Sequence, residues 1–305
     1  MITSSIGFAF ASPNAKDVRE KHEQKLFEID GISGVSVDES TNEIVVYTED
    51  AEKGKKVPKS LDGINVKQEV IGKITALSTT TLSRTTSYNP VFGGISVGNP
   101  YITAGTLGLV TTLTLNGNQV ALSNAHVLAL DSRNRFLPKV TTPIYQPGVY
   151  DGGNNGDTIG YLYNYIPISF NNNRANNKAD AAIATLTILG NVGDVLDADN
   201  INFYHISGTV TANVGDTVRK SGRTTDVTTG IVTSTSASVK VSYGGKWALF
   251  KDQIVVGTPG FSAGGDSGSA VDINGKFTGL LFAGSNTVTI VNKESNIIEQ
   301  LGITI

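Results

Sequence analysis

One glycine-rich run, residues 264–269 (GGDSGS), contains the residue types that nucleophilic chemistry needs. Glycines on both sides of Asp266 and Ser267 permit a sharp turn that exposes the serine hydroxyl. Such a turn also leaves backbone N–H groups free to point at one spot, where they can stabilise an oxyanion. A nucleophile beside an oxyanion hole is the arrangement that acyl transfer requires. The run therefore predicts a serine nucleophile at Ser267, and the alternative is an ordinary surface turn.

Two further residues have the chemistry to activate a serine. His126 follows the expected strand 119–123, so its ring would stand at a strand end with room to act as a general base. Asp180 precedes the apolar stretch 181–184, where a buried carboxylate is costly unless it meets a donor. A histidine N–H is such a donor, and the carboxylate would then fix the imidazole tautomer. The alternatives are a structural histidine and an aspartate that caps a strand.

The sequence around these residues adds a more specific signal, because five short stretches follow one another in order. They are 123–127 (SNAHV), 179–184 (ADAAIA), 220–230 (KSGRTTDVTTG), 265–268 (GDSG) and 278–285 (TGLLFAGS). These stretches resemble motifs of the bacterial trypsin-like serine proteases, near the streptogrisin and α-lytic protease group. The chain order His126, Asp180, Ser267 is also that of the chymotrypsin fold. The likeness covers about residues 93–305.

This resemblance implies a role for each residue of the site. Ser267 would attack a peptide carbonyl, His126 would take and return the proton, and Asp180 would orient His126. The backbone N–H groups of Gly265 and Ser267 would hold the oxyanion. The expected activity is that of a serine endopeptidase acting on polypeptide, without a cofactor or a metal. The alternatives are a non-catalytic protein-binding module on a protease fold and an esterase for small acyl groups.

Asp266 lies next to the nucleophile and needs its own partner. The sequence lacks the Ile-Val-Gly-Gly start whose amino group pairs with the matching aspartate in trypsins. In the bacterial branch, a basic side chain just before the Ser-Gly of the hairpin takes this role, and here that position is Lys220. We therefore expect a buried ion pair between Asp266 and Lys220 that forms the oxyanion loop without cleavage. The alternative is a solvated lysine.

The chain departs from the family pattern at two positions and leaves the substrate pocket loosely defined. Ser269 stands where a glycine is usual, and Phe282 stands where a small polar residue usually supports the aspartate. By the resemblance, Phe261 would floor the first substrate pocket, beside Phe282, with Ala283 and Gly284 on its wall. Because no acidic floor is visible, we expect a small or medium apolar side chain rather than lysine or arginine.

The elements that must position this site are mainly short strands. From residue 91 onward, apolar runs alternate with Gly, Asn and Asp turns, and a helix is expected only at 294–301. Residues 1–75 predict a helix that starts at Ser12-Pro13 and continues to about Asp30, followed by strands near 35–37, 44–47 and 64–71. The predicted fold is a chymotrypsin-like double β-barrel with a C-terminal helix, preceded by a small α/β domain.

Charge density predicts where the domains divide. Residues 1–75 carry 10 Lys or Arg and 13 Asp or Glu, whereas the other 230 residues carry 14 of each. We expect a first domain at 1–75, an exposed and cleavable Thr/Ser-rich linker at 76–92 and a protease domain at 93–305. Two roles fit the first domain. It could be a pro-region that blocks the groove and is removed, or it could stay attached and bind a partner.

Overall composition excludes several classes of protein. A net charge of −3 and a pI near 5.7 argue against nucleic-acid binding. The absence of cysteine excludes disulfides, thiol catalysis and thiolate metal sites. There is no long apolar run for a membrane span, and the first residues make a poor signal peptide. We expect a cytoplasmic protein, with an extracellular location as the alternative.

Overall fold

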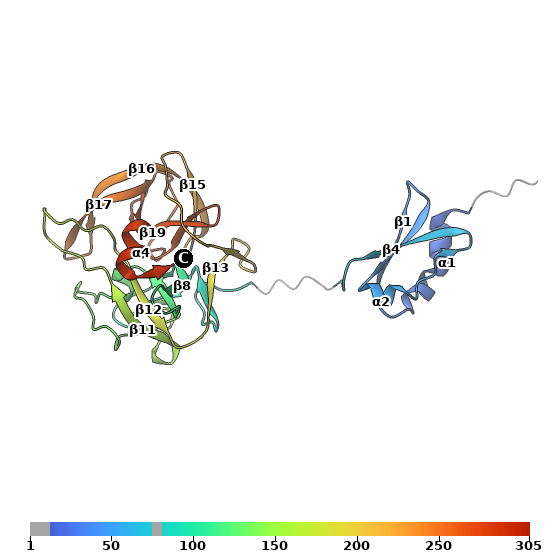
Figure 1. The fold of residues 1–305 in the computed structure, drawn as a ribbon, viewed down its shortest axis with the longest axis horizontal. Helices are drawn as coiled ribbons and strands as arrows, with labels where there is room; N and C mark the ends of the chain where they lie inside the picture. The colour runs from blue at the N-terminus through green and yellow to red at the C-terminus, as the bar shows by residue number, and fades with distance from the viewer. Residues whose placement is uncertain (1–12, 75–80) are drawn as a thin grey trace, which may run out of the picture. The chain divides into compact units, whose positions relative to one another are not determined.

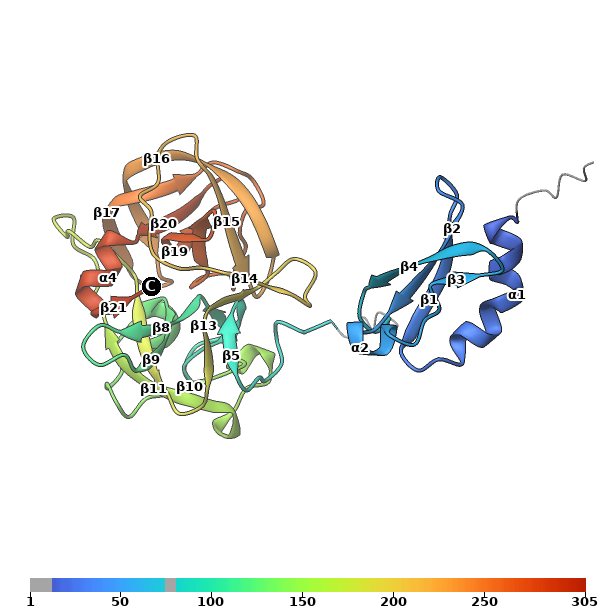
Figure 2. The same cartoon turned by 45° about the vertical axis from the view of Figure 1, so that its right-hand side comes forward.

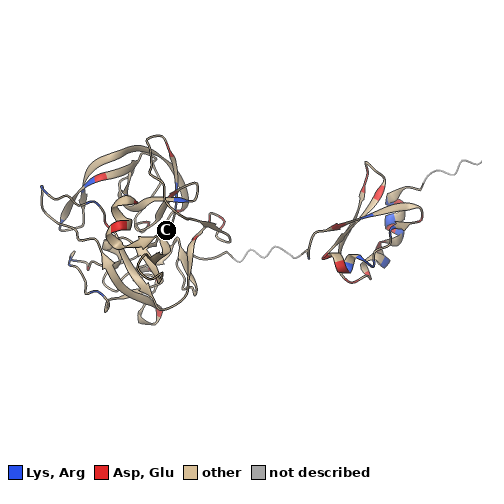
Figure 3. Cartoon of the chain, viewed as in Figure 1, with Lys and Arg blue, Asp and Glu red and all other residues tan. Residues whose placement is uncertain are grey.

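Short strands make up most of the chain in a computed structural model that describes residues 13–74 and 81–305. The chain divides into two units, Met1–Ser78 and Thr79–Ile305. Figure 3 shows charged residues crowded on the first unit and sparse on the second. The predicted mainly β architecture is confirmed, as is the late helix, which is α4 (Ser295–Leu301).

The first unit packs one helix on a four-stranded sheet of order β1-β2-β4-β3 (Figure 1). Ala15, Val18 and Leu26 form the buried stripe of the helix and meet Ile44 and Val46 of the sheet. The elements are α1 (Ala15–Phe27), β1 (Ile32–Asp38), β2 (Glu43–Thr48), α2 (Ala51–Gly54), β3 (Ser60–Leu61) and β4 (Ile64–Val70). The strands expected near 35–37, 44–47 and 64–71 correspond to β1, β2 and β4.

The start and end of α1 differ from the expectation. The side chain of Asn14, rather than Ser12, caps the helix by accepting the N–H of Lys16 at 2.9 Å. Asparagine and serine cap helices about equally well, so composition alone did not separate them. Ser12 itself lies outside the described residues. The helix ends at Phe27, three residues before the expected Asp30.

The first half of the second unit is a nine-stranded sheet. Its main path runs β10-β11-β12-β9-β8-β13-β14, with β5 added at β13 and β21 added at β8. A separate pair, β6 and β7, and the short helix α3 complete this half. The elements are β5 (Val91–Gly93), β6 (Ile95–Val97), β7 (Gly105–Leu107), β8 (Leu109–Leu113), β9 (Gln119–Ser123), α3 (Ala125–Leu128), β10 (Pro143–Tyr145), β11 (Thr158–Tyr165), β12 (Ala182–Leu186), β13 (Gly190–Leu196), β14 (Phe203–His205) and β21 (Ile303–Thr304).

The second half is a closed six-stranded barrel of order β15-β16-β17-β20-β19-β18. Figure 2 shows this barrel above the nine-stranded sheet, with α4 beside both. The strands are β15 (Thr217–Gly222), β16 (Asp226–Ser242), β17 (Trp247–Val256), β18 (Ala270–Ile273), β19 (Lys276–Gly284) and β20 (Thr289–Lys293).

One apolar core joins the two halves. Leu128 and Ile144 from the sheet half belong to the same buried cluster as Phe250 and Phe282 from the barrel. Each such side chain contributes about 1.5–3 kcal/mol when it leaves water. The two halves are therefore held against each other, and loops at their adjoining ends can form a common cleft.

The segment expected to be an exposed linker, 76–92, is described from residue 81 onward, where most residues before Val91 are exposed and a few are held by the second unit. Residues 76–80 lie outside the described residues. From 81 onward the chain is bound to the second unit: Leu82 N–H donates to Asn200 O at 2.6 Å, and Arg84 is only 5% exposed. Ser83, Thr86 and Ser87 are exposed, as their residue types suggested, whereas Arg84, with its carbonyl partners, and β5, paired with β13, are buried.

Among the described residues, no helix has the length and apolar character needed to cross a membrane.

Candidate active site

His126 and Asp180 are brought together because their strands are neighbours. Strands β9 and β12 pair antiparallel, with Ser123 opposite Ala182, so the residues after β9 lie beside those before β12. The Asp180 carboxylate is fully buried and accepts the backbone N–H of His126 at 3.0 Å. It also contacts His126 Nδ1 at 2.7 Å.

A third donor to Asp180 comes from a residue that sequence analysis did not select. The hydroxyl of Tyr243, just after β16, donates to Asp180 Oδ2 at 2.7 Å. Its ring also packs edge-on against His126, with centroids 5.9 Å apart. Burial raises the pKa of Tyr243 well above its ordinary value, and the Asp180 charge adds to the effect. The phenol therefore stays protonated and remains a donor.

The surroundings of Asp180 favour its ionised form. Burial alone would raise the pKa of Asp180, but the electrostatic interaction with His126 and hydrogen bonds from His126 and Tyr243 outweigh it. The pKa of Asp180 therefore lies below its ordinary value. An ionised carboxylate can only accept, so Nδ1 of His126 carries the proton in this pair. That tautomer leaves Nε2 as an acceptor for a substrate or a nucleophile.

Ser267 lies across the cleft in the loop before β18. Its hydroxyl donates to Phe282 O at 3.5 Å. Across residues 13–74 and 81–305, no hydrogen bond joins this hydroxyl to His126. Both residues line one cavity of about 590 Å³, together with Tyr243 and Ala283. The structure thus brings His126 and Ser267 to a single cleft, with Asp180 buried in contact with His126. Nucleophile and base are often loosely spaced in sites without substrate.

The loop around Ser267 has the backbone shape of an anion-binding turn. Gly265 has φ +100° and Gly268 has φ +97°, values that side chains rarely permit. A Cβ at Gly265 would also collide with Thr224 Oγ1. In the described part of the chain, the N–H groups of Gly265 and Ser267 donate to no other group. They are available to hold a developing oxyanion.

Buried contacts of the Asp266 carboxylate hold this loop in place. The carboxylate accepts the N–H groups of Thr224 and Thr225 at 2.9 and 3.1 Å, and that of Ala263 at 2.9 Å. Lys220 Nζ lies 3.7 Å from Asp266 Oδ2, and both side chains are fully buried. The Thr225 hydroxyl bridges them, accepting from Lys220 at 2.5 Å and donating to Asp266 at 2.6 Å. The structure therefore places Lys220 at the expected partner rather than in solvent.

The two departures from the family motifs have structural explanations. Ser269 is buried, and its hydroxyl donates to Asp266 O at 2.7 Å, so it adds a bond within the nucleophile loop. Phe282 packs against Phe250 in the shared core, with ring centroids 4.8 Å apart. The hydroxyl that Phe282 lacks is supplied to Asp180 by Tyr243, which lies in the turn between β16 and β17.

A second cavity, of about 600 Å³, adjoins Ser267. Ala283 and Gly284 line it, as expected from the sequence. The expectation for Phe261 is wrong, because this side chain is 1% exposed and belongs to the core of the barrel. Its size and apolar character favour burial over a place on the cavity wall. Phe282 lines the neighbouring cavity that contains His126.

Tyr243 was missed as a site residue because no local pattern marks it, and Thr225 lay in the motif 220–230 but was given no role of its own. Tyr243 contacts Asp180 across 63 positions of sequence, and its aromatic type alone indicated core packing. No three His, Asp or Glu side chains of the described residues gather closely enough to hold a metal ion.

No protein-family model matches the sequence, and neither does any curated protein. Three solved structures of similar fold are protease A of Thermobifida fusca, Nocardiopsis protease and a glutamic acid-specific serine protease. Their sequence identities are 15%, 16% and 21%, with TM-scores of 0.51, 0.52 and 0.52. The matches cover 70%, 71% and 70% of this chain and 97%, 100% and 100% of those structures. The chain therefore has the fold of the bacterial chymotrypsin-like serine proteases, as its motifs predicted.

Proposed function

We propose that the second unit is a serine endopeptidase. The observation that supports this most is the arrangement around one cleft. Asp180 fixes His126 with Nε2 free on one side, while Ser267 and two unengaged N–H groups stand on the other. The neighbours of similar fold are serine proteases, which favours peptide bonds as the substrate.

Each group has a defined part in the proposed reaction. Ser267 Oγ attacks the peptide carbonyl as its proton passes to Nε2 of His126, and the Asp180 carboxylate stabilises the resulting imidazolium. The carbonyl oxygen becomes an oxyanion held by the N–H groups of Gly265 and Ser267. His126 then protonates the leaving amine, and an acyl-enzyme remains. Water, deprotonated by His126, releases the acid and restores Ser267.

The pocket beside Ser267 suits an uncharged side chain. Of the described residues that line it, none is charged. Ser262 and Thr289 share a hydroxyl–hydroxyl bond of 2.6 Å next to Gly284, so the wall is not wholly apolar. An unpaired lysine, arginine or glutamate would be desolvated there without a counter-charge, which is costly. We therefore propose hydrolysis after uncharged residues, and a panel of peptides varied at that position would measure it.

A fluorophosphonate probe tests the proposed function directly. The wild-type chain should be labelled at Ser267, and labelling should be lost in Ser267→Ala and in His126→Ala. Ser236→Ala is the matched control, because this exposed serine lines neither of the two cavities beside Ser267. It should label like wild type. A folded wild-type chain that neither reacts with the probe nor cleaves any peptide would refute the proposal.

One observation favours a second candidate, a non-catalytic peptide-binding module. The Ser267 hydroxyl faces Phe282 O rather than His126. If the probe fails while the cleft still binds peptides, and Ser267→Ala binds them equally well, the module is the better description.

A further inference from the structure

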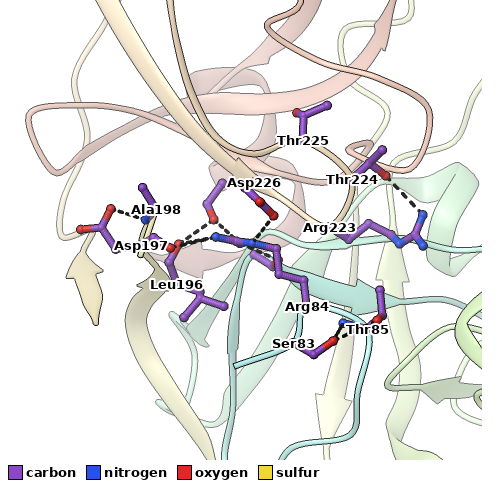
Figure 4. Close-up of polar contacts among 12 residues, drawn as sticks. Ser83, Arg84, Thr85, Leu196, Asp197, Ala198, Arg223, Thr224, Thr225 and Asp226 are labelled. Atoms are coloured by element: carbon purple, nitrogen blue, oxygen red, sulfur yellow. Dashed lines mark hydrogen bonds and ion pairs between the residues drawn. The ribbon is translucent and has the colours of Figure 1, made fainter. Parts of the chain in front are cut away.

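Arg84 is a buried cation on the segment that leads into the nine-stranded sheet, and the proposed reaction does not use it. Figure 4 shows its guanidinium directed at Leu196, Asp197 and Asp226. It donates to Leu196 O at 3.3 Å and Asp197 O at 3.0 Å, and its Nε lies 2.8 Å from Asp226 Oδ1. Its other amino group donates to Ser221 Oγ at 2.6 Å. Arginine's planar fork can satisfy this many acceptors at once.

Asp226 links this arginine to the ion pair beneath the nucleophile loop. Its backbone has φ +49°, a left-handed turn conformation, so its position depends on what holds it. Arg84 holds the carboxylate, while Lys220 Nζ donates to the carbonyl oxygen of the same residue at 2.8 Å. Arg84 therefore contacts the side chain of Asp226, and Lys220 contacts its backbone.

The same turn holds the nucleophile loop. Thr224 and Thr225, which precede Asp226, direct both of their N–H groups onto Asp266 Oδ1. Asp266 lies between Gly265 and Ser267, whose N–H groups form the proposed oxyanion hole. A continuous series of contacts thus runs from Arg84 through the turn 222–226 to that hole.

Packing around Arg84 leaves little room for a different arrangement. A Cβ at Gly94 would come within 2.8 Å of Arg84 Nη1 and 2.6 Å of Ser221 Oγ. Gly94 itself has φ +89° and its carbonyl accepts from Arg84 at 3.0 Å. The guanidinium is therefore fixed by both the chain next to it and the turn beyond it.

We propose that Arg84 is a positioning residue for the oxyanion hole. It holds the turn 222–226 in the conformation that lets Asp266 shape the loop 263–268. The kinetic part of this inference rests on the proposed peptidase function. Its structural part, the coupling of Arg84 to the nucleophile loop, does not.

The test compares Arg84→Gln with wild type and with Arg174→Gln in the full chain. Arg174 is an exposed arginine on the loop 171–177, so its loss removes the same charge without touching the turn. Hydrogen–deuterium exchange is measured on peptides that cover 222–226, 263–268 and, as an internal reference, 109–113. Fluorophosphonate labelling rates, kcat and KM are measured on the same samples.

Arg84→Gln should speed exchange in 222–226 and 263–268 while 109–113 keeps its protection. It should lower kcat about tenfold with KM little changed, a smaller loss than the 10²–10³ expected for removing an oxyanion donor. Arg84→Lys keeps the charge but not the fork, so it should restore part of both signals. Arg174→Gln should match wild type in every measurement.

The outcomes separate this inference from the proposed function. Unchanged exchange at 263–268 in a folded Arg84→Gln chain overturns the inference, whether or not the protein hydrolyses peptides. An inactive wild type refutes the peptidase, while the exchange data still decide the coupling. A rise in exchange at 109–113 equal to that at 263–268 shows general destabilisation and also overturns it. If Arg84→Gln does not fold, Asp226→Asn weakens the same link while the arginine keeps its carbonyl partners.

Discussion

Tyr243, in the turn after β16, makes a contact with Asp180 that the sequence motif lacks. Its hydroxyl reaches the buried Asp180 carboxylate, while Phe282 fills core space with a ring. Asp180 consequently has three donors, two from His126 and one from Tyr243. A buried carboxylate needs this many partners, because an unsatisfied charge in a dry site is expensive.

Tyr243→Phe removes one hydrogen bond to a charged group and keeps the ring. Such bonds contribute about 1.5–3 kcal/mol, so kcat/KM should fall by roughly 10- to 100-fold if the whole loss reaches the transition state. Peptide kinetics would measure this, with Tyr101→Phe, an exposed tyrosine, as the matched control. A Tyr243→Phe chain as active as wild type would show that His126 alone suffices to hold Asp180.

Lys220 should give the activity an alkaline limit. Burial lowers the pKa of Lys220 to about 8, although the charge of Asp266 opposes the change. Arg84 also lowers it, and Asp226 opposes. As pH rises through about 8, the lysine loses its proton and Asp266 loses its buried counter-ion, so kcat/KM should fall. Lys220→Arg carries a guanidinium that does not titrate in this range, and its decline should move to higher pH.

The sign of the stability change distinguishes this loss from unfolding. Because the pKa of Lys220 in the folded protein is below its ordinary value of 10.5, the unfolded chain binds more protons between about pH 8 and 10.5. This group alone therefore makes the fold more stable as pH rises through that window. Activity that falls above pH 8 while the thermal midpoint also falls steeply would point to another group and contradict the assignment.

At the scale of elements, the backbone conformation of the nucleophile loop depends more on Gly265 than on Gly264. Gly265 combines φ +100° with a collision for any Cβ, whereas nothing lies within 4 Å of a Cβ at Gly264. The adjacent glycines thus offer a test of backbone shape with almost no change in composition.

Gly265→Ala should displace the oxyanion N–H and lower kcat by about 10²–10³, the loss typical of a removed donor. Gly264→Ala should stay within a few-fold of wild type. Steady-state kinetics on one peptide compares the two, and circular dichroism confirms that both are folded. Equal activities would mean that Gly265 contributes no donor to the reaction.

The sequence predicted the elements whose signals are local. The strand at 119–123 was expected with the bounds it has as β9. His126 was expected at the end of a strand and lies in the short helix α3 that follows β9, whereas Asp180 lies just before β12, as expected. The roles of Arg84 and Tyr243 were not predicted, because their partners Ser221 and Asp180 lie 137 and 63 positions away and no periodicity links such residues. Phe261 was misplaced since its position relative to Ser267 does not reveal which way the ring turns.

At the scale of the whole molecule, the boundary between the units has a testable chemical consequence. Lys73 is exposed near the end of the described part of the first unit, whereas Arg84 is buried in the second. Trypsin cleaves after both residue types but needs an accessible, extended segment. Brief digestion of Ser267→Ala, which removes the proposed self-cleavage, should therefore cut after Lys73 long before Arg84. Mass spectrometry identifies the products, and equal rates at the two sites would contradict the packing of 82–90.

The same boundary bears on the role of the first unit. If the wild-type chain processes itself, its intact mass should show a cut that is missing in Ser267→Ala. Because Leu82 and Arg84 are bound to the second unit, the new chain should begin no later than Leu82. A product that begins after Arg84 would lack the residue proposed to position the oxyanion hole.

Strand β21 carries a consequence for biosynthesis. Its Ile303 pairs with Leu113 of β8, and Thr111 donates to Thr304 across 193 positions. During vectorial synthesis, the edge of β8 therefore emerges from the ribosome long before its partner exists. A bare edge of this kind invites pairing with other nascent chains. Until residues 303–304 have been synthesised, the part of β8 at residues 112–113 therefore lacks the partner strand that covers it in the folded protein.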